Sequence, residues 1–216
     1  GDKEYMMKLI YQGARLSFYM LLLLSLPVIV NAHYILVVWL KIVPDHTVAF
    51  VQLILVSAMC ESISNPLITA MLATGNIKKY QIIVGSLQLM NVPICYLFFR
   101  LGYFPESVMI ISIIMSQCCL FVRLFLLRKM IGLSSILFFK KVYFNILLVS
   151  LASVLFPLIL ESKLTESFCS FFVKSIVSIL CTSFAILYVG CSRYERGLIK
   201  NKATLLKDKI FKNDKY

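Results

Sequence analysis

Six long apolar segments, separated by short polar and basic ones, make up most of the sequence. About 20 helical residues cross the roughly 30 Å hydrocarbon core of a bilayer. The segments run continuously apolar and do not alternate between apolar and polar positions, as the strands of a membrane barrel would. The pattern therefore predicts an all-α integral membrane protein with six transmembrane helices. The predicted spans are residues 16–31, 48–74, 80–99, 107–122, 142–160 and 167–192.

The second predicted span, residues 48–74, carries polar side chains that a simple anchor helix would not need. A polar residue recurs at every fourth position and forms one stripe along the helix: Ser57, Glu61, Asn65 and Thr69. A carboxyl group facing lipid costs at least about 2.5 kcal/mol, so this stripe should face protein or water. It either lines a pathway through the membrane or packs against a neighbouring helix with Glu61 protonated. Pro66 lacks a backbone donor and predicts a kink beside the stripe.

The third predicted span, residues 80–99, has a second polar face. Gln88 and Asn91 lie on this face, and we add them to the candidate pathway residues. Pro93 predicts a second kink, and Gly85 would let another helix approach closely. The fourth span carries a stripe of small residues, whose usual role is helix packing: Ser112, Ser116 and Cys119.

Two further segments are too short to span a bilayer and are predicted to lie at its surface. Residues 31–47 contain the only tryptophan, Trp39, in keeping with the preference of Trp and Tyr for the interface. Residues 129–141 are basic at both ends and apolar between, a pattern typical of an amphipathic surface segment. The chain thus divides into residues 1–130 with four spans, residues 131–192 with the surface segment and two spans, and a basic tail over residues 193–216.

The composition agrees with a membrane protein. Of the 216 residues, 60% are hydrophobic and 15% are charged, against about 25% charged residues in soluble proteins. The net charge is +12, but the basic residues lie between the apolar segments, which indicates membrane topology and not a nucleic-acid surface. With the amino terminus in the cytoplasm, 18 of the 22 Lys and Arg residues fall on the cytoplasmic side and three on the other side. This asymmetry predicts six spans with both ends of the chain in the cytoplasm.

One basic residue lies inside a predicted span. Lys174 is about two turns into the sixth span, counted from its outer end. Its long side chain either extends to the membrane surface or forms an ion pair with Glu161 or Glu166.

No motif for catalysis or nucleotide hydrolysis is present. The sequence has no GxxxxGK[ST] phosphate loop, no HExxH zinc motif and no GxSxG nucleophile motif. Its seven cysteines lack CxxC spacing, which predicts neither a metal site nor a disulfide framework. We therefore predict a non-enzymatic protein without a cofactor: a transporter, a channel or a scaffold. The first residues, GDKEYMMKL, look like the interior of a chain, so we expect a fragment of a longer protein.

Three stretches together resemble a known family: GDKEYMMKLIYQGARLSFYMLLLLSLPVI, ILVVWLKIVPDHTVAFVQLILV and NPLITAMLATGNIKKYQIIVGSLQLMNVPICYLFFRLGY. They are similar to the carboxyl-terminal half of bacterial polysaccharide-unit flippases. These form the O-antigen (Wzx-type) branch of the multidrug/oligosaccharidyl-lipid/polysaccharide exporter superfamily. The most specific pieces are WLKIVPDHT and ATGNIKKYQ, and the resemblance runs to about residue 190, strongest over residues 1–130.

The resemblance implies a transport role and a further lobe. Family members carry an undecaprenyl-pyrophosphate-linked oligosaccharide across the bacterial inner membrane by alternating access between two lobes of helices. Spans one to four would complete the second lobe, spans five and six would be an extra pair, and the amino-terminal lobe would be missing. The polar stripes would line half of the pathway, and Glu61 would bind a coupling H⁺ or Na⁺. Arg15 and Arg123 would attract the pyrophosphate, a task suited to guanidinium groups.

Plainer alternatives stay open at this point. Arg15 and Arg123 lie at the cytoplasmic ends of predicted spans and would also serve as topology anchors. The chain would equally suit a cation-coupled multidrug antiporter of the same superfamily. A third alternative is a membrane scaffold or an inactive remnant, because half of a cavity cannot alternate access by itself.

Overall fold

The computed structural model describes residues 2–75, 77–161, 167–191 and 195–197, and over these residues it consists of helices without any strand. The α-helices are α1 (Asp2–Val30), α2 (Ala32–Leu40), α3 (Thr47–Ser62), α4 (Asn65–Ala73), α5 (Ile77–Leu89), α6 (Asn91–Arg100), α7 (Ser107–Ile131), α8 (Ser135–Phe138), α9 (Phe144–Glu161) and α10 (Phe168–Ala185). Two π-helical turns join them, η1 (Phe139–Tyr143) and η2 (Ile186–Gly190). Six helical segments are long and apolar enough to cross a membrane. The prediction of an all-α, multi-pass membrane protein is confirmed.

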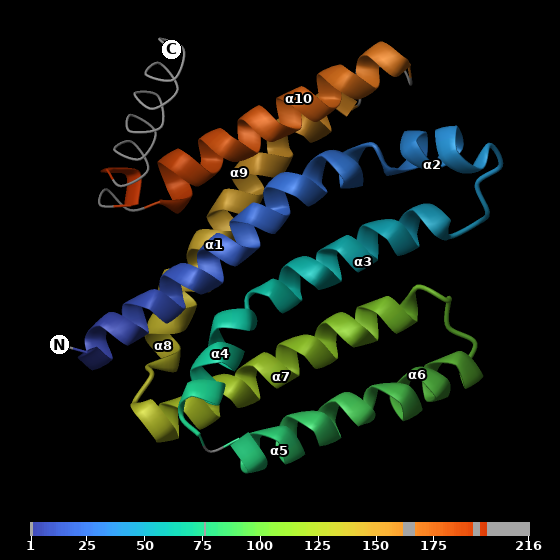
Figure 1. Cartoon of the computed structure of the whole chain (residues 1–216). Helices are drawn as coiled ribbons and strands as arrows, with labels where there is room; N and C mark the ends of the chain where they lie inside the picture. Colours follow the sequence, from blue (N-terminus) through green and yellow to red (C-terminus); the bar gives the residue numbers. More distant parts are fainter. Residues whose placement is uncertain (1, 76, 162–166, 192–194, 198–216) are drawn as a thin grey trace, which may run out of the picture.

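The six spans pack side by side in a definite order (Figure 1). The pair α9 and α10 packs on α1, α1 packs on α3 and α4, and these pack on α7. On its other side α7 contacts α5 and α6, which together form the least buried of the six spans. This order makes α3–α4, α5–α6 and α7 neighbours at one edge of the bundle.

The core lies where α1, α4, α7 and α8 meet. Its fully buried side chains include Tyr19, Leu67, Leu120, Leu124 and Phe138. The ring of Tyr11 packs edge-on against Phe138 with 6.0 Å between centroids, and its hydroxyl donates to the carbonyl of Ser134 at 3.5 Å. These contacts hold α1 against the connection between α7 and α9.

Both predicted kinks are full interruptions of a helix. α3 ends at Ser62, and α4 begins just before Pro66. The ring of a proline collides with the carbonyl of the fourth residue before it, whereas a proline in the first turn of a new helix costs no hydrogen bond. In the same way α5 ends at Leu89, four residues before Pro93. Residues at both interruptions line a polar cavity between α3–α4, α5–α6 and α7.

Two predicted boundaries in the middle of the chain are wrong. The fourth span was expected to end at Arg123, but α7 continues to Ile131 and Arg123 is buried. Residues 129–141 were expected to lie on the membrane surface, yet Leu133 and Phe138 are fully buried and α8 leads into the fifth span. Part of the apolar middle of this segment therefore packs into the protein core, while Ile136 and Leu137 stay exposed. Amphipathicity alone does not distinguish packing on protein from packing on the membrane.

The first helix also begins much earlier than predicted, at Asp2 instead of Leu16. Ile10, Tyr11 and Ala14 are buried at helical spacing, so the apolar face continues through the charged beginning of the chain. The burial of this apolar face stabilises the start of the helix, although the opposite face carries charged residues.

At the other end of the bundle, short segments join the spans. α2 is a nine-residue helix, too short to cross a bilayer, in which Trp39 is 78% exposed. Its position at the membrane surface stays a prediction. His46, with a φ of +67°, bonds to the Glu106 carboxylate and ties the loop before α3 to the loop before α7. The pKa of Glu106 is lowered, mainly by a hydrogen bond from the backbone of Glu106 itself and secondly by the bond to His46.

Lys174 does not extend along the outer surface of the bundle. It is 7% exposed and lines a small cavity of about 40 Å³ with Asn31 and Ser170, between α10 and the end of α1. Of its two predicted partners, Glu166 lies outside the described residues, and the side chain of Glu161 is not described.

Two glycines allow a matched test of the packing. A Cβ atom on Gly190 would lie 2.8 Å from Cε2 of the buried Tyr19 ring, whereas one on Gly85 would meet nothing within 4 Å. The close helix approach expected at Gly85 is therefore absent. We predict that Gly190→Ala lowers the free energy of unfolding by about 1–3 kcal/mol, because the overpacked ring must move.

Gly85→Ala is the control, and we expect it to be neutral or to stabilise the helix by up to about 1 kcal/mol. Thermal unfolding of the purified protein in detergent measures both. Equal melting temperatures for Gly190→Ala and the wild type would contradict the packing of α1 on η2.

Candidate functional site

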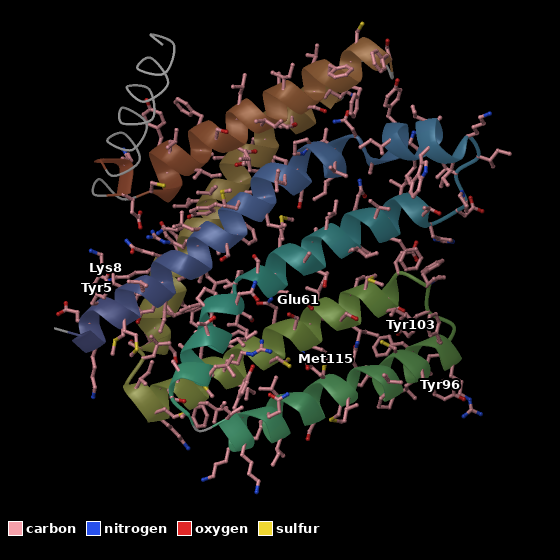
Figure 2. All side chains as sticks on the ribbon, viewed as in Figure 1. Tyr5, Lys8, Glu61, Tyr96, Tyr103 and Met115 are labelled. Carbon is pink, nitrogen blue, oxygen red and sulfur yellow. The ribbon has the colours of Figure 1, made fainter. Side chains whose placement is uncertain are left out.

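A polar cavity of about 400 Å³ lies between α3–α4, α5–α6 and α7. Its lining residues are Glu61, Ser64, Asn65, Ile68, Gln88, Asn91, Ser112, Met115, Ser116, Cys119 and Arg123. Figure 2 shows Glu61 near the junction of α3 and α4 and Met115 on the neighbouring α7. Polar groups are expensive in the membrane interior, so their concentration in one cavity marks a candidate functional site. We call it the polar cavity.

One face of α7 forms the longest wall of the polar cavity. The contributing positions follow helical spacing: Ser112, Met115, Ser116, Cys119 and Arg123. At 1.5 Å per residue, the face from Ser112 to Arg123 runs about 16 Å along the helix. The cavity therefore extends along roughly half of the hydrocarbon thickness.

The interruption between α3 and α4 supplies the second wall. The amide of Ser64 donates to the carbonyl of Glu61 at 2.9 Å, which closes a tight turn at the break. The turn leaves Glu61 and Asn65, on the two sides of the break, facing one cavity. α1 packs against this turn. Its Gly13 lies so close to Pro66 that a Cβ atom on the glycine would be only 3.1 Å from the proline ring.

Asn91 connects the third wall to α7. Its amide nitrogen donates to the hydroxyl of Ser112 at 3.2 Å, and that hydroxyl donates to the carbonyl of Val108 at 2.9 Å. Asn91 also accepts from the thiol of Cys95 at 3.5 Å. Asn91 follows the break between α5 and α6, so this break, like the first, places an amide beside α7.

Arg123 is the buried charge of the polar cavity. It is 6% exposed, and its Nε donates to the Tyr80 hydroxyl at 3.3 Å while Nη1 donates to the Ser64 hydroxyl at 3.1 Å. No carboxylate oxygen of the described residues lies within 4.0 Å of its guanidinium group. Hydroxyl oxygens satisfy part of its hydrogen-bonding capacity but do not neutralise its charge.

Glu61 lines the same cavity without pairing with Arg123. Its side chain is exposed, and no hydrogen bond joins it to another residue in the described part of the chain. The polar cavity thus presents a carboxylate and a guanidinium group to the same space, and each is available to a ligand or ion of opposite charge.

The structure brings together most, but not all, of the predicted pathway residues. Four of the six line the polar cavity: Glu61, Asn65, Gln88 and Asn91. Arg123, which was predicted to attract the head group, lines it as well. Ser57 and Thr69 do not line it, and the Thr69 hydroxyl donates to the carbonyl of Asn65 at 3.1 Å. The predicted stripe assumed one continuous helix. Because the helix breaks, only residues between 61 and 68 of this span line the polar cavity.

Arg15 lies elsewhere. Its Nη2 donates to the Glu195 carboxylate at 2.8 Å, and Nη1 donates to the carbonyl of Gly190 at 3.4 Å. The two arginines that the sequence grouped together are therefore in different environments. Arg15 is paired with a carboxylate, whereas Arg123 bonds to two hydroxyls and to no carboxylate of the described residues.

Three residues that orient side chains of the polar cavity were not predicted as site residues. Ser64 and Tyr80 orient Arg123, and Ser112 orients Asn91. The small-residue stripe of the fourth span did identify one face of α7, but packing was its expected role. The helical spacing of Ser112, Ser116 and Arg123 is the signal that could have placed this face at a polar site.

No family model, curated protein or solved structure matches this chain. The case for its function therefore rests on the geometry above and on the sequence.

We predict that Tyr80→Phe destabilises the protein by about 1 kcal/mol, because the buried Arg123 loses an acceptor. Tyr96→Phe is the control, since Tyr96 is 65% exposed and lies outside the polar cavity. Melting temperatures in detergent, measured for both variants, check the prediction. If the two substitutions have the same effect, the Tyr80 hydroxyl does not support Arg123.

Proposed function

We propose that this chain forms one wall of a membrane pathway that carries lipid-linked oligosaccharides across the bacterial inner membrane by alternating access. The observation that carries the proposal is Arg123, a buried cation without a carboxylate partner among the described residues, at one end of the polar cavity. A guanidinium group binds phosphate oxygens in a bidentate manner, and a desolvated one gains most from an anionic ligand. The proposed ligand is an undecaprenyl-pyrophosphate-linked oligosaccharide.

The other lining groups suit the sugar part of such a ligand. Asn65, Gln88 and Asn91 offer amide donors and acceptors, which match the hydroxyls of a saccharide. The lipid tail would remain in the bilayer beside α5–α6, the least buried span. This division of the ligand between a polar cavity and the surrounding lipid agrees with the resemblance to polysaccharide-unit flippases.

The opposite wall would come from a second lobe of helices. Glu61, Asn65 and Gln88 are exposed although they line the polar cavity, so the cavity is open on one side. A second lobe facing this side would close it, with both ends of the present chain in the cytoplasm as the distribution of basic residues favours. Glu61 would take up H⁺ or Na⁺ in one of the two orientations.

A second candidate function rests on Glu61 itself. An exposed carboxylate in a membrane cavity attracts cations, which suits a cation-coupled multidrug antiporter of the same superfamily. Arg123 at the same cavity disfavours cationic drugs by repulsion. The experiment below separates these alternatives and also a non-transporting scaffold.

The test is complementation of a strain from which the gene has been deleted. We expect the gene to restore surface polysaccharide, and Arg123→Gln to reduce it about tenfold or more, since one charge-assisted hydrogen bond is worth about 1.5–3 kcal/mol. The lipid-linked intermediate should accumulate in the same cells. Glu61→Gln should also trap the intermediate if the carboxylate couples transport to an ion.

Arg128→Gln is the matched control, because Arg128 is an exposed arginine on the same helix outside the polar cavity. It should complement like the wild type. Unchanged surface polysaccharide after gene deletion would refute the flippase proposal, and loss of drug resistance in that strain would support the antiporter instead. If the deletion strain keeps both its surface polysaccharide and its drug resistance, the scaffold alternative is supported.

A further inference from the structure

A second cavity, of about 700 Å³, lies at the end of the bundle where α1 begins. Its walls come from the first turns of α1, from α8 and η1, and from Glu195 beyond η2. It shares no lining residue with the polar cavity, so it is a separate site. We call it the basic pocket.

Cationic groups outnumber acidic ones in the basic pocket. Of the described residues, Lys8, Arg15 and Lys141 line it together with Glu4 and Glu195, an excess of one positive charge among these five. The ion pair of Arg15 with Glu195 fixes the guanidinium group, whose Nε is buried and has no hydrogen-bond partner. These lining groups therefore favour an anion over a cation.

The remaining walls are apolar and aromatic. Met7 and Leu137 line the pocket, and the Nζ of Lys141 lies 5.7 Å from the centroid of the Tyr11 ring. Tyr5 is 68% exposed, and Figure 2 shows Tyr5 and Lys8 close together at the start of α1. Tyrosine beside lysine, at the end of a membrane span, is the arrangement found at the level of lipid head groups.

We propose that the basic pocket binds the phosphate of an anionic phospholipid from the surrounding leaflet. Lys141 binds the phosphodiester, Arg15 stays paired with Glu195 at the wall of the pocket, and the acyl chains follow the apolar surface next to Leu137. A lipid fits better than a soluble anion, because the pocket combines a small positive excess with apolar walls at a membrane surface. A lipid bound there clamps α1 to η1, since both contribute to the pocket. The proposal does not depend on the transport function.

The test measures lipid binding to the purified full chain in detergent, by titration with fluorescent phosphatidylglycerol. Phosphatidylcholine with the same acyl chains is the neutral comparison, and we expect phosphatidylglycerol to bind more tightly. Lys141→Gln should weaken phosphatidylglycerol binding about fivefold, the effect of one cation near a membrane surface. Glu4→Gln should strengthen binding by a similar factor, because it removes a repulsive carboxylate from an exposed position.

Lys140→Gln is the matched control. Lys140 is an exposed neighbour of Lys141 that does not line the basic pocket, so its substitution should leave the affinity unchanged. Equal weakening by the two lysine substitutions would overturn the proposal in favour of general surface attraction, and equal affinity for both lipids would overturn it outright. Displacement of the lipid by inorganic pyrophosphate at comparable concentration would identify a soluble anion as the ligand and also overturn it.

Discussion

The burial of the Arg123 guanidinium group constrains the part of the bundle that forms the polar cavity. A charged group inside an apolar bundle is costly unless polar atoms surround it. Here the acceptors come from two other helices: Ser64 at the start of α4 and Tyr80 on α5. α4, α5 and α7 must therefore keep their relative positions for the charge to stay satisfied. These hydroxyls make hydrogen bonds without cancelling the charge, and the polar cavity next to Arg123 stays attractive to anions.

The two helix interruptions provide part of the polar lining, Ser64 at one and Asn91 at the other. A continuous helix keeps its backbone bonded internally and presents only side chains, whereas a break opens a turn in which carbonyls, amides and short side chains meet a cavity. The break before Pro66 places Ser64 against Arg123, and the break before Pro93 places Asn91 against Ser112. Both prolines thus act by allowing two short helices in place of one long one. A bundle of uninterrupted helices with the same composition would have fewer ways to satisfy a buried arginine.

The sequence predicts the membrane class, the six spans and a distortion at each of the two prolines, because hydrophobic length and the chemistry of proline are local properties. It predicts kinks, whereas the structure has full interruptions. It also identifies Glu61, Asn65, Gln88 and Asn91 as polar positions within spans. It does not predict the fate of residues 129–141, since an apolar face packs equally well on lipid or on protein. The continuation of α7 through Arg123 escaped prediction for a related reason. A basic residue near the end of an apolar run usually marks the membrane boundary, and only the hydroxyls of Ser64 and Tyr80, distant in sequence, allow it to be buried.

The contrast between Arg15 and Arg123 separates a structural charge from one that can act on a ligand. Arg15 is held by the carboxylate of Glu195, so an anionic ligand must share it or displace a partner already in place. Among the described residues, Arg123 has only neutral acceptors, and a ligand phosphate would add an interaction without breaking an ion pair between them. The free energy available for binding is therefore larger at Arg123, although both residues are arginines in helices of the same bundle. By the same reasoning, the exposed Lys141 and not Arg15 should dominate the response of the basic pocket to anions. Charge alone does not define a binding site in this protein; the partner that each charge already has decides it.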